Sequence, residues 1–242
     1  MGNKSYDEII AESHKERESF LQAIKNGDPI RINYFKNIMV VEIKGDLLNI
    51  MSRVPGNKLR SYKNFLLSHN TLYSYSAEKG GLSAAQSHFM SEKYAIMIEH
   101  TNQIEDLDQI HLNMIDAYMD TSIRMKYRST LTIYEKTLNF IEMNFSEHFT
   151  IDDIAKKLHV HSSHLMRVFK KESGTTISHY RNQRRIKEAK ELLAHTNMSM
   201  TEIAVMIGFN NSQYFSKIFK QIAKITPKTF KQNMSPGNKM QV

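Results

Sequence analysis

The residues best suited to chemistry in this chain are short polar and cationic side chains on one face of a predicted helix, Asn210–Lys220. Within it, Phe215, Ile218 and Phe219 follow the i, i+3, i+4 spacing of a buried helix face. The opposite face then presents hydroxyl, amide and ammonium groups, which can hydrogen-bond base edges in a DNA major groove. The apolar stretch just before it closes at Gly208. A helix, a Gly-containing turn and a second helix are typical of a helix-turn-helix.

The same unit occurs twice in the sequence. Residues 150–180 align with residues 199–230 at an offset of 49, which becomes 50 after one inserted residue. Apolar positions pair with apolar positions throughout, and Phe169 of the first copy meets Phe219 of the second. Two unrelated amphipathic helix pairs would not repeat the turn, the caps and the Phe-Lys dipeptide in register. The repeat therefore indicates one supersecondary unit used twice.

Short motifs recur in both copies and in the segment between them. The second copy has Ile203-Ala204, Gly208-Phe209, Tyr214-Phe215-Ser216, Phe219-Lys220 and Thr226-Pro227; the first has Ile154-Ala155, Leu165, Phe169-Lys170-Lys171 and Gly174; the segment between them has Arg185, Ile186, Ala189, Leu192 and Leu193. Over about residues 131–231 this pattern resembles the AraC/XylS family of bacterial transcription regulators. Two positions depart from it. Lys224 stands where the family usually has a Gly that suits a left-handed helix cap, and Phe230-Lys231 replaces Tyr-Arg.

The resemblance implies that the helix predicted over residues 176–195 holds two recognition helices in successive major grooves, about 34 Å apart. Of the base-reading positions it implies, Arg167 suits guanine, Gln213 suits adenine, and Met166 suits a thymine methyl. For each lysine the alternative is an ordinary solvated charge. The implied base contacts are Ser163, Met166, Arg167, Ser212, Gln213, Ser216 and Lys217, and the implied phosphate contacts are Lys170, Lys171, Arg184, Lys220 and Lys228.

Length and charge predict two domains. Residues 1–128 carry 16 Lys/Arg and 16 Asp/Glu, whereas residues 129–242 carry 17 and 9, so the second half holds the whole net charge of +8. An excess confined to one half indicates a polyanionic partner for that half. We therefore expect a helical regulatory or dimerisation domain over 1–128 and a double-stranded-DNA-binding domain over 129–242. Within the latter, the units are expected at about 150–172 and 199–222.

Periodicity predicts an all-α fold for the first half as well. Expected helices follow a capping box at Ser5 and Glu8, span Lys58–Lys79, and continue over Ile104–Ser129. Between them, Ser83 and Ser91 are expected to cap two separate helices. Residues 30–51 favour helix, with a short strand at Ile38–Ile43 as the alternative. We also expect a helix from Thr130 into the second domain.

The first half lacks the alternating strands of the family's sugar-binding barrels, and it resembles instead the helical N-terminal half found in a subset of the family. Its role is open between a dimerisation module without ligand and a sensor for an unknown small-molecule effector. The aromatic-rich residues that suggest a sensory pocket are Tyr62, Phe65, Tyr73, Tyr75, His88 and Tyr94.

Other chemistry finds little support in the sequence. Nucleophile-elbow, metalloprotease, P-loop and dinucleotide motifs are missing, so we expect no enzyme, catalytic residue or cofactor. His159, His161 and His164 overlap the turn and recognition helix and lack Cys or carboxylate partners, so we expect no metal site. The chain has no Cys and no long apolar run, which predicts a soluble cytoplasmic protein without a membrane partner. The sequence thus favours a DNA-binding regulator, with activation, RNA polymerase contact and homodimerisation as family expectations. The alternative is a ligand-sensing repressor or a regulator acting through protein–protein contacts.

Overall fold

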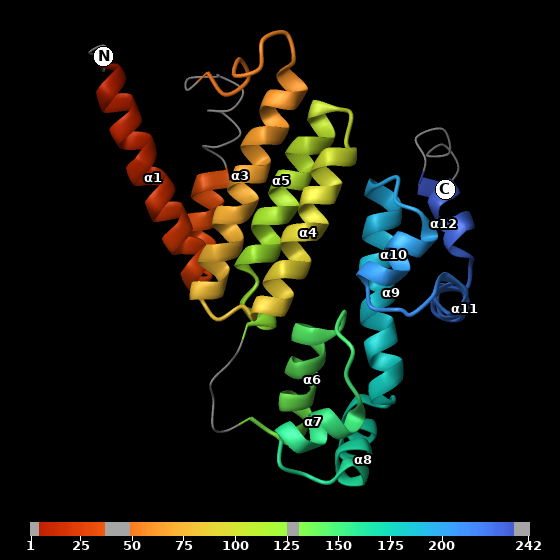
Figure 1. Cartoon of the computed structure of the whole chain (residues 1–242). Helices are drawn as coiled ribbons and strands as arrows, with labels where there is room; N and C mark the ends of the chain where they lie inside the picture. Colours follow the sequence, from red (N-terminus) through yellow and green to blue (C-terminus); the bar gives the residue numbers. More distant parts are fainter. Residues whose placement is uncertain (1–4, 37–48, 125–130, 235–242) are drawn as a thin grey trace. The chain divides into compact units, whose positions relative to one another are not determined.

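The computed structural model describes residues 5–36, 49–124 and 131–234, and within these ranges the chain is all-helical, without a strand, as the sequence predicts. Its helices fall into two compact units, Met1–Arg124 and Met125–Val242 (Figure 1). Each helix in those ranges is too short or too polar to span a bilayer.

The first unit is a bundle in which one helix, α3, packs against three others (Figure 1). Buried side chains of α3, including Tyr62, Leu66 and Tyr73, form the centre of the core. The elements are α1 (Tyr6–Asn26), α3 (Lys58–Lys79), α4 (Ala84–His100), α5 (Ile104–Met119) and the 3-10 turn η1 (Thr121–Ile123).

Local capping signals set most of these boundaries. Ser5 and Glu8 form the predicted capping box of α1, and Gly27 ends that helix in the left-handed conformation with φ 64°. Ser83 caps α4 as expected by accepting from the Gln86 amide, whereas Gln86 Oε1 is buried without a partner among the described atoms.

Two predictions for this unit are wrong. Ser91 does not start a new helix; it lies inside α4, where its carbonyl accepts from the Asn70 side chain at 2.8 Å. The last helix stops at Met119 rather than running to residue 129, because the Asp120 carboxylate accepts from the Ser122 amide and caps a 3-10 turn. Of the stretch 30–51 favoured as helix, residues 30–36 are helical and residues 49–51 are not. The strand alternative at Ile38–Ile43 lies outside the described residues.

The end of the first unit is fixed by a buried arginine. Arg124 is 4% exposed, and its guanidinium donates to the carbonyls of Ile24 and Lys25 at the end of α1 and of Tyr118 at the end of α5. A guanidinium supplies several donors in a fixed fork, so one side chain can bond the terminal carbonyls of two helices at once.

In the second unit, one long helix, α9 (Ile177–His195), connects two groups of shorter helices (Figure 1). α9 contacts α6 and α8 on one part and α10, α11 and α12 on the other. The remaining bounds are α6 (Ile133–Asn144), α7 (Ile151–Lys157), α8 (Ser162–Ser173), α10 (Met200–Met206), α11 (Ser212–Ala223) and α12 (Pro227–Met234).

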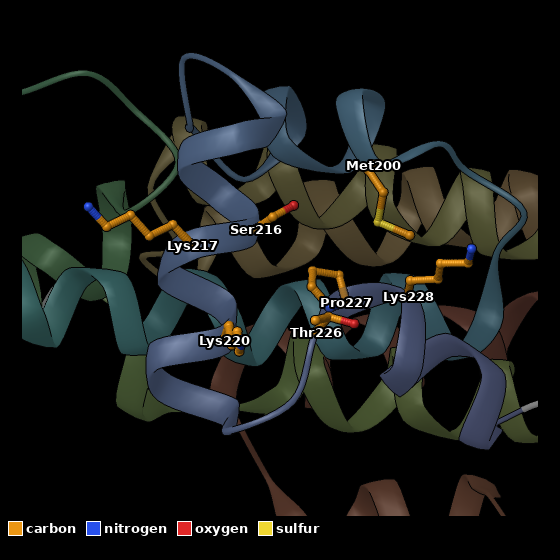
Figure 2. A pocket seen from close by; sticks show the side chains of 7 residues that line it. All are labelled: Met200, Ser216, Lys217, Lys220, Thr226, Pro227 and Lys228. Atoms are coloured by element: carbon orange, nitrogen blue, oxygen red, sulfur yellow. The ribbon is translucent and has the colours of Figure 1, made fainter.

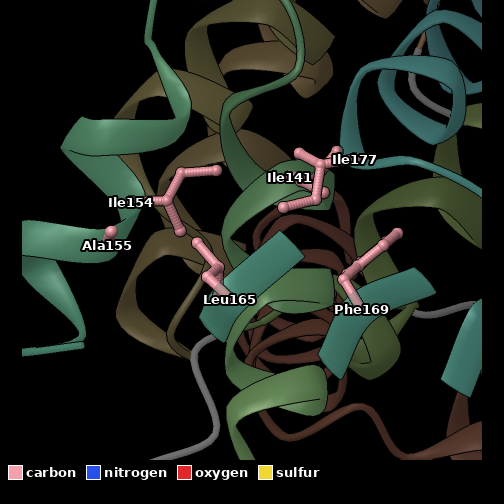
Figure 3. Packing of buried hydrophobic residues seen from close by; sticks show 6 residues of the cluster. All are labelled: Ile141, Ile154, Ala155, Leu165, Phe169 and Ile177. Carbon is pink, nitrogen blue, oxygen red and sulfur yellow. The ribbon is translucent and has the colours of Figure 1, made fainter. Parts of the chain in front are cut away.

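Each helix-turn-helix has its own apolar core. Figure 3 shows the first, in which Leu165 and Phe169 of α8 lie against α7 and the adjoining helices. In the second, Phe215 and Phe219 of α11 are fully buried in the same way. The first core consists of Ile141, Ile154, Ala155, Leu165, Phe169 and Ile177. Burial of these apolar side chains turns the polar face of each recognition helix outward.

Candidate nucleic-acid interface

The scaffold helix of each unit is started by the predicted capping box. Thr150 exchanges hydrogen bonds with Asp153 at the start of α7, and Ser199 exchanges them with Glu202 at the start of α10. The backbone amide and hydroxyl of Thr150 both donate to the Asp153 carboxylate and lower its pKa. The two short helices therefore begin at matched positions, which fixes where each following turn begins.

The turns use a left-handed residue at equivalent positions. His159 has φ 54° in the first turn, and Gly208 has φ 85° in the second. His159 is exposed, whereas a Cβ on Gly208 would lie 2.2 Å from the Ser146 carbonyl oxygen. Only glycine fits the second turn, both for its backbone conformation and for this close approach.

The first recognition helix, α8, exposes the three side chains expected to read bases. Ser163 and Arg167 are exposed, and Met166 is 45% exposed although it is apolar. His161 caps the helix through Nδ1, which accepts from the Ser163 amide at 3.4 Å and also lies 2.9 Å from the Ser163 hydroxyl. The Arg167 guanidinium lies 3.2 Å from His164 Nδ1, one turn earlier, so these two polar groups adjoin each other on α8.

The second recognition helix, α11, presents a more polar face. Gln213 and Lys217 are exposed, while Ser212 and Ser216 are half-buried beside them. Asn211 caps the helix by accepting from the Tyr214 amide at 2.8 Å. The structure thus brings together the four predicted residues of this helix, although the two serines leave only part of their surface open to a ligand.

A shallow groove of about 470 Å³ lies beside α11, and three lysines are among the residues around it (Figure 2). The side chains of Lys217 and Lys228 extend in opposite directions from it. The Thr226 hydroxyl accepts from the Thr229 amide and caps α12 at the groove. The lining residues are Met200, Ser216, Lys217, Lys220, Thr226, Pro227 and Lys228. A concave surface with several ammonium groups suits the phosphate backbone of a nucleic acid.

Four of the five predicted phosphate contacts are exposed cations, namely Lys170, Lys171, Lys220 and Lys228. Arg184 is different. Its side chain is 13% exposed and donates to Glu142 at 2.7 Å and to Glu188 at 2.5 Å. Burial lowers the pKa of Arg184, but the two carboxylates outweigh it and the net shift is upward. Because both acids already hold it, we correct the prediction and leave Arg184 out of the interface.

Sequence reasoning missed the contacts of two arginines on α9. Arg181 and Arg185 each donate to a backbone carbonyl of the segment that joins α6 to α7, and each lies over an aromatic ring. The available signal was their spacing of four residues, which puts two cations on one helix face, where Arg185 is followed by the buried Ile186. Their carbonyl partners, Phe149 and Phe145, are more than 30 residues away in sequence, so spacing alone could not identify them.

The six residues that suggested a sensory pocket in the first unit do not converge. Tyr75 and His88 are exposed, whereas Tyr62, Phe65, Tyr73 and Tyr94 are core residues. The buried rings are held by specific partners: Tyr62 donates to Asp108 at 2.8 Å, and the Tyr73 hydroxyl lies 3.1 Å from His111. Burial lowers the pKa of His111 to about 3, so the imidazole is neutral in this core. The four buried rings therefore stabilise the bundle as core residues, and a sensory pocket near them stays an untested alternative.

Known proteins are similar to this chain over its second unit. A family model described as a helix-turn-helix domain matches residues 154–233. PocR of Salmonella typhimurium, a regulatory protein, is 30% identical over 43% of this chain and 34% of its own length. The lactose operon transcription activator of Staphylococcus xylosus is 30% identical over 43% of this chain and 38% of its own length. PqrA of Proteus vulgaris is 37% identical over 38% of this chain and 75% of its own length. The chain thus spans well under half the length of the first two of these relatives.

Proposed function

Because the chain belongs to the AraC/XylS family of transcription regulators, we propose that it is a sequence-specific DNA-binding regulator that inserts α8 and α11 into two successive major grooves. One observation carries this proposal: two equivalent helices bury matching apolar faces and expose polar and cationic faces, and both pack against the uninterrupted α9. A single charged helix face would be an ordinary solvated surface, but two in a repeated scaffold support a linear, repetitive partner such as duplex DNA.

Base reading falls to the outward positions of the two helices. Arg167 offers a bidentate fork to the O6 and N7 atoms of guanine, and Gln213 pairs in the same way with adenine. Met166 has no polar atom suited to this readout, so its contribution is apolar contact with a thymine methyl. The proposed base-reading set is Ser163, Met166, Arg167, Ser212, Gln213, Ser216 and Lys217.

Phosphate contacts hold the protein on the duplex and fix the register. We assign them to Lys170 and Lys171 at the end of α8, and to Lys220 and Lys228 in the groove of Figure 2. Each neutralised phosphate releases counterions, so log K should fall by about 0.9 per phosphate for each unit of log salt. Four such contacts give an expected slope of about −3.6 from these lysines alone.

The first unit is assigned a regulatory or dimerising role. Its aromatic core is closed by internal hydrogen bonds, so we place no effector among these rings. The resemblance to an activator of the lactose operon supports activation, with RNA polymerase as a partner. We assign the protein no catalytic role and place it in the cytoplasm, where its DNA partner lies.

The test is selection of bound fragments from genomic DNA with the full-length protein, followed by affinity measurements on the recovered site at several salt concentrations. We expect one enriched motif with two blocks about one helical turn apart, and a steep negative salt slope. Recovery of random fragments with one common affinity would contradict sequence-specific recognition. A motif with a single block would contradict reading by two helices.

A further inference from the structure

Within residues 125–242, a buried arginine contacts both helix-turn-helix copies. Arg185 lies on α9 and is 5% exposed. Its Nε donates to the Phe145 carbonyl at 2.6 Å, and its Nη2 donates to the Glu147 carbonyl at 3.1 Å. Both acceptors belong to the segment between α6 and α7, so this guanidinium fixes the entrance to the first helix-turn-helix.

The same guanidinium also touches the second helix-turn-helix. It lies over the ring of Phe209, 5.2 Å from the ring centroid. Phe209 is buried and packs against Phe215, a core residue of α11, with 5.6 Å between ring centroids. Arg185 therefore bridges a backbone segment of one unit and the aromatic core of the other.

Backbone packing at Gly208 supports the same bridge. A Cβ built there would lie 2.2 Å from the Ser146 carbonyl oxygen and 2.6 Å from Arg185 Nη2. The turn of the second helix-turn-helix thus lies directly against the α6–α7 segment, which leads into the first helix-turn-helix. The absence of a side chain at Gly208 is what permits this approach.

A second arginine lies one turn away and extends the contact. Arg181 donates to the Phe149 carbonyl at 2.9 Å and lies 4.7 Å from the centroid of the Phe149 ring. Burial, then the nearby Arg181 charge, lowers the pKa of Arg185 to about 10, with Tyr214 of α11 acting in the opposite direction. Arg185 is therefore still charged near neutral pH, which strengthens its bonds to the two carbonyls.

We propose that Arg185 and Gly208 are positioning residues that set the placement of α8 relative to α11 and thereby the half-site spacing that the protein accepts. Without this junction, the two helix-turn-helix copies would be connected only through their separate contacts with α9. The Arg185–Gly208 junction adds a connection between the units, so that the two helices move as one body. This inference rests on the proposed function only where it concerns half-site spacing.

The first experiment measures the placement without DNA. The chain contains no Cys, so Glu172→Cys and Gln221→Cys place single spin labels on exposed positions near the ends of α8 and α11. We expect one narrow distance distribution by pulsed electron spin resonance in the otherwise unchanged full-length protein. Arg185→Met should broaden or shift it, and Gly208→Ala should do the same by pushing Ser146 away while keeping the guanidinium.

The matched control is Lys187→Met, which removes an exposed cation two residues away on the same helix. It should leave the distribution unchanged. Helix content measured by circular dichroism identifies variants that fail to fold. If Arg185→Met does not fold, Gly208→Ala and Arg185→Lys decide the matter. The first keeps the guanidinium, and the second keeps the charge but has one nitrogen where Arg185 bonds through two. Unchanged distributions in the folded variants would overturn the inference.

The second experiment uses the site selected by the wild-type protein and a copy with five base pairs, half a helical turn, inserted between its two blocks. Loss of simultaneous engagement should weaken wild-type binding by roughly 100-fold. For Arg185→Met we expect a penalty below about tenfold, mainly because binding to the unmodified site has lost its avidity. A full penalty in Arg185→Met would overturn the inference while leaving the proposed function intact. If the wild-type protein selects no site, the proposed function fails, and the spin-label distances still test the junction.

Discussion

The two helix-turn-helix units adopt the same backbone conformations with different residues, and the turn shows why. His159 and Gly208 occupy equivalent left-handed positions, with φ 54° and 85°. Solvent surrounds the first, so a side chain is tolerated there, whereas Ser146 and Arg185 crowd the second and permit only glycine. The turn of one copy thus faces water while the turn of the other faces its neighbour. Differences between repeats can therefore locate the contact between them.

At the ends of the recognition helices, the glycine is in the first copy and the residue with a side chain is in the second. Gly174 ends α8 with φ 72°, and Lys224 ends α11 at the equivalent position with φ 66°. Nothing lies within 4 Å of a Cβ built on Gly174. Glycine at this position serves the backbone alone, and the second copy adopts the same conformation with a lysine at some cost in strain.

The largest effect should come from the equivalent cores of the two helix-turn-helix copies. Phe169→Ala and Phe219→Ala each remove a fully buried ring at equivalent positions. We expect each to lower the free energy of unfolding by about 3–5 kcal/mol, measured by urea denaturation. Met166→Ala, on the exposed face of α8, is the control and should change stability by less than about 0.5 kcal/mol. A cost above about 3 kcal/mol in one copy and below about 1 kcal/mol in the other would show that the cores are not equivalent.

The next largest effect should be a loss of DNA affinity when an exposed cation of α8 or α11 is removed. Arg167→Ala should weaken binding to the selected site by about 1–3 kcal/mol, with the loss confined to one or two base pairs. Lys217→Ala, at the equivalent position of α11, should weaken recognition at base pairs about one helical turn away. Competition binding with single-base variants of the site measures both. An equal loss on every sequence would make the residue concerned a phosphate contact.

The smallest effect should come from the caps. Lys224→Gly should raise the free energy of unfolding by about 0.5–1 kcal/mol, because glycine adopts the left-handed conformation without strain. Gly174→Lys makes the reciprocal change in open space and should lower it by a similar amount. Thermal and urea unfolding of both variants check the comparison. No gain from Lys224→Gly would mean that the lysine side chain makes a compensating contribution.

Sequence reasoning predicted what is encoded locally. The capping boxes at Ser5, Thr150 and Ser199 each form, because their partners lie three residues away. Long-range contacts escaped it. Arg184 and Arg185 are adjacent, yet the first pairs with Glu142 and the second with the carbonyl of Phe145.

The same limit explains the errors in the first unit. Ser91 has the right residue type for an N-cap, but α4 continues through it and Asn70 on α3 accounts for its carbonyl. Tyr73 and Tyr94 are amphipathic and suit a ligand site as well as a core. Only the packed partners, such as His111 for Tyr73, show that these rings are interior. Tertiary contacts, rather than residue type, decide between such alternatives.

The unlike outward faces of α8 and α11 have a consequence for how a regulator of this kind sits at a promoter. Met166 and Arg167 on one helix correspond to Ser216 and Lys217 on the other, so the two faces cannot be exchanged. A single protomer would then recognise its site in one orientation only and give the bound complex a head and a tail. Inverting the site would turn the protein end for end, so transcription should depend on which way the site points.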